Sequence, residues 1–185
     1  GIDAALAMRS KHGVDPDRIA RIRLGGATSA LRTIGDPREE KLRPQSGYHA
    51  QFSGPFTVAA ALLGGGGLGV SFEDFTDGRA RDPRVLALAA KVETYADPEC
   101  DRIFPMQFPA VLTVEMEDGA LFEERVSVNR GGPDNPLTDE ELQLKLRLHA
   151  ERALAPDRAP ALADAVDTLA EAPGVGGLLE LTREG

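Results

Sequence analysis

The chain has 185 residues, a length that suits one domain with a buried core. Its 21 Lys and Arg residues against 30 Asp and Glu residues give a formal net charge of -9. Nucleic acid and anionic membranes are disfavoured as partners, because both repel an acidic surface. A single cysteine, Cys100, excludes an intrachain disulfide. The low cysteine content makes a cytoplasmic location the expectation, and no apolar run reaches the roughly 20 residues that span a bilayer.

The first half of the chain begins with a helix and a strand. Apolar spacing from Ile2 predicts a helix that ends at Gly13, and alternation over 19–24 predicts a strand. The polar, turn-rich stretch 25–43 is expected to be a loop.

The most informative stretch is Pro44–Gly67, where a polar opening runs into an alanine-rich apolar segment that ends in four glycines. Pro55 is tolerated mainly in the first turn of a helix, and glycine readily ends one. The stretch therefore predicts a helix whose polar end is able to face a ligand.

The second half carries clearer local signals. Asp82-Pro83 begins a helix with an N-cap and a proline in its first turn, and a short strand is expected near 92–96. Asp118-Gly119 separates two runs in which apolar and polar residues alternate, which predicts a hairpin with one buried side. Glu124 is the exception to this alternation. Thr138 opens a capping box, and two short helices are expected in a tail over 155–185.

These elements predict an α+β fold. Strands interleaved with helices, together with the alternating hairpin, indicate a two-layer domain. We expect a small, mainly antiparallel sheet of about four strands with helices packed on one face.

The best local site lies at the polar start of the featured stretch. His49 can exchange a proton near neutral pH, which makes it the candidate catalytic residue. Gln51 and Ser53 can hold a carboxylate or an enolate oxygen, and Arg43 can pair with a carboxylate through two hydrogen bonds. The alternative is that Ser53 or Ser46 caps a helix and that His49 and Arg43 are solvated.

Other titratable residues carry weaker signals. His12 is expected at a helix C-terminus, and His149 in the capped helix is expected to be structural. The histidines lack a metal-ligand spacing, so no metal site is predicted. Acidic neighbours should raise the pKa of Cys100, which makes a catalytic thiolate improbable.

Several segments, in order, resemble the C-terminal region of the MmgE/PrpD family. Individually these patterns are weak, and their order along nearly the whole chain is more specific. They are IDAALAMRSKHGV, PDRIARIRL, YHAQFSGPFTVAAALL, DPRVLALAAKVE, VLTVEMEDG and GGPDNPLTDEELQLK.

The resemblance implies the smaller α+β domain of a cofactor-independent lyase or isomerase that acts on small polycarboxylates. The family includes 2-methylcitrate dehydratase, cis-aconitate decarboxylase and iminodisuccinate epimerase, and the first is the closest expected activity, in propionate catabolism. The decarboxylase branch has a tyrosine that falls close to Leu31, so decarboxylation is the least expected. Within the sequence, the family's pattern carries over to Ala50–Ser53, with Ser53 as the closest match.

The resemblance also implies partners. The sequence starts at Gly1 inside a helix pattern, so the resemblance implies that the family's large helical domain, with its histidines and aspartate, is expected to lie outside this chain. We expect one wall of a shared site, near inactivity of the isolated chain, and a homo-oligomer such as a homodimer. The alternative is a non-catalytic binding or assembly module on the same scaffold.

Overall fold

The computed structural model describes residues 1–64 and 67–183. The chain forms two compact units, 1–136 and 137–185. The division lies before the capped helix, which therefore groups with the helical tail expected over 155–185.

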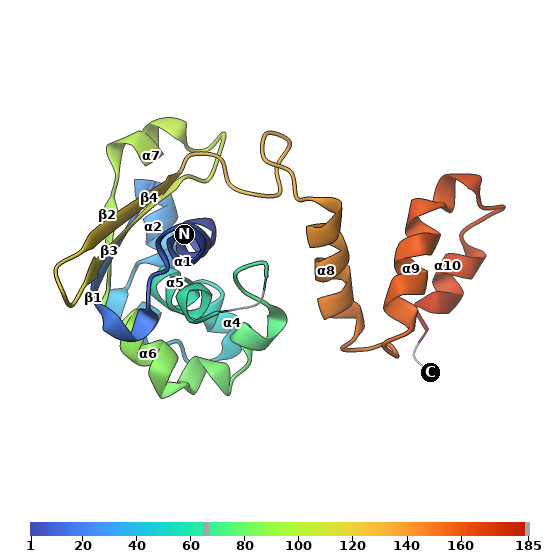
Figure 1. Cartoon of the computed structure of the whole chain (residues 1–185), viewed down its shortest axis with the longest axis horizontal. Coiled ribbons are helices and arrows are strands. Elements are labelled where there is room, and N and C mark those ends of the chain that lie inside the picture. Colours follow the sequence, from blue (N-terminus) through green and yellow to red (C-terminus); the bar gives the residue numbers. More distant parts are fainter. Residues whose placement is uncertain (65–66, 184–185) are drawn as a thin grey trace. The chain divides into compact units, whose positions relative to one another are not determined.

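The first unit combines a four-stranded sheet with helices, as the α+β prediction expected (Figure 1). Its elements in chain order are α1 (Ile2–His12), η1 (Pro16–Arg18), β1 (Ile19–Gly26), α2 (Thr28–Ile34), α3 (Arg38–Leu42), α4 (Gly47–Ala50), α5 (Gly54–Leu63), η2 (Phe72–Phe75), η3 (Arg79–Arg81), α6 (Pro83–Ala89), β2 (Val92–Ala96), α7 (Pro98–Ile103), β3 (Ala110–Met116) and β4 (Leu121–Val126).

The sheet has the order β2-β1-β3-β4. β1 pairs with β2 in parallel, and the pairs β1–β3 and β3–β4 are antiparallel. The sheet is therefore mainly antiparallel, because the β3–β4 hairpin and the β1–β3 pair outnumber the single parallel crossover.

The main core lies between one face of the sheet and helices α1, α5 and α6, which Figure 1 places together on that side. The inward side chains of β3 alternate with outward ones, so Leu112 and Val114 are fully buried whereas Glu115 is exposed. Helix α5 is apolar on nearly all sides and supplies Phe56, Val58 and Leu62 to this core.

A smaller cluster covers the opposite face at one end of the sheet. Val111 points away from the main core and packs with Ala27 and Cys100, near α2 and α7. Helices thus form a full layer on one face and a partial cover on the other.

One sequence prediction for this unit was wrong. The stretch 25–43 is not a loop, because β1 continues to Gly26 and is followed by α2 and α3. The Asp101 carboxylate accepts hydrogen bonds from the backbone N–H and the hydroxyl of Thr28, at 2.7 and 2.8 Å, and so caps α2 from a distant part of the chain. Buried Leu31 then fixes α2 by packing.

The featured stretch 44–67 contains the predicted helix, α5, and a second, short helix, α4, in its polar opening. α4 ends at Ala50, and α5 starts anew after Ser53, because Ser53 accepts a hydrogen bond from the Phe56 N–H and Pro55 occupies the first turn. Gly64 ends α5 in the left-handed conformation, as expected of a glycine there. Gly65 and Gly66 lie outside the described residues.

The structure of the hairpin explains why Glu124 departs from the alternation of buried apolar and exposed polar residues. Glu124 lies on the core-facing side of β4, where its carboxylate binds Lys11 Nζ and His12 Nε2, each at 2.9 Å. The hydrogen bond from Lys11 and then the one with His12 lower the pKa of Glu124 below its ordinary value. His12 lies at the C-terminal end of α1, as predicted, and its ring packs on Phe122.

The second unit is helical over its described residues. Thr138 and Glu141 form the predicted capping box, with each side chain accepting from the other residue's N–H. Its elements are α8 (Asp139–Ala150), α9 (Arg158–Asp167), η4 (Leu169–Glu171) and α10 (Gly176–Leu181). Across the described chain, no helix is both long and apolar enough to cross a bilayer.

Candidate functional site

The four predicted site residues lie between the end of α3 and the start of α5. Arg43 follows α3, His49 lies in α4 and Gln51 follows α4, and all three are exposed. Ser53 is completely buried. The structure therefore brings three of the four predicted residues to the surface and places the fourth in the interior.

Helix α4 is held firmly although it has only four residues. Ser46 caps it by accepting from the His49 N–H, at 3.2 Å. The Gly47 N–H donates to an Asp77 carboxylate oxygen at 2.8 Å. A Cβ atom at Gly47 would lie 1.8 Å from the Phe75 carbonyl oxygen, so the α4 backbone packs directly against the C-terminal end of η2.

Ser53 has the cap role that the sequence left open as an alternative. Its hydroxyl accepts from the Phe56 N–H at 3.0 Å and donates to the Lys41 carbonyl oxygen at 2.5 Å. One side chain therefore starts α5 and ties it to the end of α3. With both bonds made inside the protein, Ser53 positions the candidate site without facing solvent.

Replacing Ser53 by alanine should lower the free energy of unfolding by about 2 kcal/mol. The loss combines a helix cap with a buried carbonyl left without its donor. Urea unfolding followed by circular dichroism measures it. Ser46→Ala is the matched control, because Ser46 caps only the four-residue α4 and should cost about 0.5 kcal/mol. Equal losses in the two variants would contradict the buried role of Ser53.

The exposed residues are available to a ligand. Within residues 1–64 and 67–183, the guanidinium of Arg43, the ring nitrogens of His49 and the amide of Gln51 have no hydrogen-bond or ion-pair partner. A guanidinium binds a carboxylate through two N–H groups, an amide donates to oxygen, and an imidazole exchanges a proton near neutral pH. Each of these side chains is therefore chemically able to bind or polarise a small carboxylic acid.

Tyr48 lies beside His49 and is in turn packed against Phe52, two aromatic side chains that were not predicted as site residues. Tyr48 is 67% exposed and Phe52 is 41% exposed. Their rings meet edge to face with centroids 5.3 Å apart, and the rings of Tyr48 and His49 lie 6.2 Å apart. The aromatic spacing at 48 and 52, one turn apart, is the signal that would have indicated this contact.

The other titratable candidates are structural. Burial, followed by a hydrogen bond to Asp97, raises the pKa of the Cys100 thiol to about 11, in the direction that the sequence predicted. His149 bonds to the Lys145 carbonyl oxygen one turn earlier in α8. In the part of the chain that the structure describes, no three His, Cys, Asp or Glu residues group in a way that could hold a metal ion.

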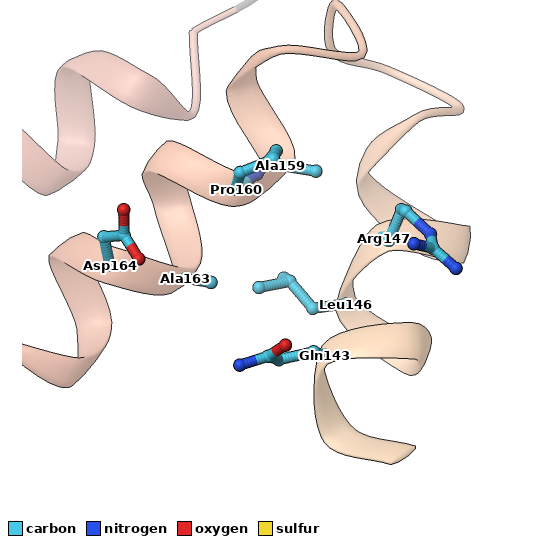
Figure 2. Close-up of a pocket in the computed structure, with 7 residues that line it drawn as sticks. All are labelled: Gln143, Leu146, Arg147, Ala159, Pro160, Ala163 and Asp164. Carbon is cyan, nitrogen blue, oxygen red and sulfur yellow. The ribbon is translucent and has the colours of Figure 1, made fainter. Parts of the chain in front are cut away.

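A shallow groove of about 160 Å³ lies within the second unit, between α8 and α9. Figure 2 shows Leu146 and Gln143 reaching from α8 toward Ala163, whereas Arg147 points away. Small apolar side chains form much of its lining. We therefore interpret the groove as space left where two helices pack imperfectly, without an acid–base pair that would suggest catalysis.

Comparison with known proteins identifies the family of this α+β domain. The MmgE/PrpD C-terminal domain matches residues 1–171, so the chain belongs to the MmgE/PrpD family, as the ordered segments indicated.

Two relatives are cis-aconitate decarboxylases. The chain is 28% identical to the Mus musculus protein over 174 residues, which cover 90% of this chain and 33% of that protein. It is 29% identical to the Homo sapiens protein over 126 residues, which cover 68% of this chain and 25% of that protein. The chain thus spans at most about a third of the length of these curated relatives.

Proposed function

We propose that this chain is the smaller part of a cofactor-independent lyase or isomerase of small polycarboxylates, and that the exposed surface around α4 forms one wall of its site. Family membership supports the reaction class. The observation that carries the site is that Arg43, His49 and Gln51 are exposed and, among residues 1–64 and 67–183, have side-chain donors without a partner, around a helix α4 that Asp77 holds at Gly47. In this proposal His49 moves the proton, and Arg43 and Gln51 bind carboxylate oxygens.

The first reaction to test is dehydration of 2-methylcitrate, which eliminates water and would place the protein in propionate catabolism. The relatives are named for decarboxylation of cis-aconitate, which releases CO₂. Leu31, near which the decarboxylase branch has a tyrosine, is a buried apolar side chain here and supports dehydration over decarboxylation. The proposal includes a helical partner domain, a homodimer and a cytoplasmic location.

Carboxylate binding tests the site. Calorimetric titration of citrate, 2-methylcitrate, cis-aconitate and itaconate into the chain should show weak binding to the wild type. Arg43→Ala should weaken it by about tenfold, the loss expected for hydrogen bonds to a charged group, and His49→Ala and Gln51→Ala should weaken it less.

Arg32→Ala serves as the control, because Arg32 is an exposed arginine of α2 outside the proposed wall and should leave binding unchanged. Equal effects of the two arginine variants would place binding elsewhere. Product detection by proton NMR then separates dehydration from decarboxylation, and we expect little turnover by this chain alone.

A non-catalytic binding or assembly module is the second candidate. Exposed Tyr48 and Phe52 favour it, because exposed aromatic side chains are enriched at protein interfaces. Absence of carboxylate binding by the wild type would support the module and overturn the proposed wall.

A further inference from the structure

Tyr48 combines high exposure with a fixed position. Its neighbour Gly47 is bound to Asp77 and seated against the Phe75 carbonyl, so the backbone that carries Tyr48 has little freedom. The ring is braced edge to face by Phe52, at a centroid distance of 5.3 Å. A tyrosine that only faces solvent needs neither a held backbone nor a neighbouring ring to brace it.

The Tyr48 hydroxyl is available for binding. Among the residues that the structure describes, no side chain or backbone group forms a hydrogen bond with it. Its ring lies beside that of His49, with centroids 6.2 Å apart, so one ligand can contact both. A phenol donates a hydrogen bond to a carboxylate oxygen and offers an apolar face to the carbon skeleton.

We infer that Tyr48 is a further substrate-binding residue, which donates its hydroxyl hydrogen to a carboxylate of the same ligand that His49 faces. Phe52 positions the Tyr48 ring. This inference rests on the proposed function, because it assigns a role within the same wall. It adds a neutral donor to Arg43 and Gln51, so that a ligand with two or three carboxylates finds separate partners for them.

Tyrosine fluorescence tests this directly, because the chain contains two tyrosines and no tryptophan. In the Tyr95→Phe variant, all emission comes from Tyr48. Tyr95 belongs to β2, where the Arg23 guanidinium lies over its ring, and it is not one of the residues of the proposed wall. Titrating citrate into Tyr95→Phe should quench the emission with the same midpoint as calorimetry, since a carboxylate that accepts from an excited phenol quenches it.

Tyr48→Phe should weaken citrate binding by about tenfold, the loss of one hydrogen bond to a charged group. Phe52→Leu should weaken it by about threefold, because the ring of Tyr48 loses its brace. Tyr95→Phe, measured by calorimetry, should bind like the wild type. Circular dichroism should show all three variants folded, since Tyr48 and Phe52 are exposed.

The two failures are distinguishable. If the wild type binds citrate while Tyr48→Phe binds equally well and the Tyr48 emission does not change, the role of Tyr48 is overturned and the proposed wall stands. If the wild type binds none of the acids, both are overturned.

Discussion

Gly47→Ala should destabilise the protein by about 3 kcal/mol, because the new Cβ atom would collide with backbone and not with a movable side chain. It would lie 1.8 Å from the Phe75 carbonyl oxygen and 2.5 Å from the Phe75 carbonyl carbon. The clash should also break the hydrogen bond from the Gly47 N–H to Asp77, so α4 should move away from the Phe75 backbone. Urea unfolding measures the loss, and the same variant should lose carboxylate binding.

Gly78→Ala is the matched control in the neighbouring segment. Its Cβ atom would come no closer than 4.0 Å to the Thr76 hydroxyl, and its backbone is already helical. Its free energy of unfolding should change by less than about 1 kcal/mol, with a gain possible from reduced freedom of the unfolded chain. A Gly47→Ala protein as stable as Gly78→Ala would contradict the close packing of α4 against the Phe75 backbone.

Asp97→Asn should cost about 2 kcal/mol at neutral pH and much less in acid. Asp97 is nearly buried, caps α7 through the Cys100 N–H and receives two hydrogen bonds from Arg125, at 3.0 and 3.1 Å. Removing one partner of a buried ion pair commonly costs about 3–5 kcal/mol. We expect less here, because the Arg125 side chain is 37% exposed and water screens its charge.

The pH dependence has a definite sign. The hydrogen bonds from Arg125 hold the pKa of Asp97 far below its ordinary value. A depressed pKa contributes stability that is complete above the unfolded-state value of about 4 and is lost as the pH falls below it. The stabilities of wild type and Asp97→Asn should therefore draw progressively closer as the pH falls below about 4.

The exposed pair of Asp17 and Arg84 is the control for Asp97. It is also joined by several short hydrogen bonds, but both side chains are more than 60% exposed. Asp17→Asn should cost less than about 0.5 kcal/mol. Parallel pH profiles for Asp97→Asn and wild type would show that the buried pair contributes no pH-dependent stability.

Local signals predicted much of the fold because their partners lie within a few residues. The Asp118-Gly119 turn, the caps at Asp82 and Thr138 and the stop at Gly13 each depend on backbone groups in the same turn. The cap at Ser53 is local as well, because its hydroxyl accepts from the Phe56 N–H three residues later, and the sequence left this role open as an alternative to ligand binding. Only the packed structure shows its second bond, to the Lys41 carbonyl oxygen.

The candidate site also combines features that the sequence could predict with features that only the packing of the helices decides. His49, Gln51 and Arg43 could be chosen by their chemistry, and their exposure agrees with a solvent-facing role. The burial of Ser53 and the bracing of Tyr48 by Phe52 depend on how α3, α4 and α5 pack. Those contacts follow from geometry that residue types do not reveal.

By itself, the sequence determined the α+β class, the hairpin, the helix ends and the family, because periodicity, caps and ordered segments are written in neighbouring residues. The tertiary structure decided the rest. Asp101 caps α2 across 73 residues, Arg125 reaches Asp97 across 28, and Asp77 holds α4 across 30. Such long-range bonds form only after the chain has packed, which is why the sequence predicted a loop where α2 forms and left the role of Ser53 open.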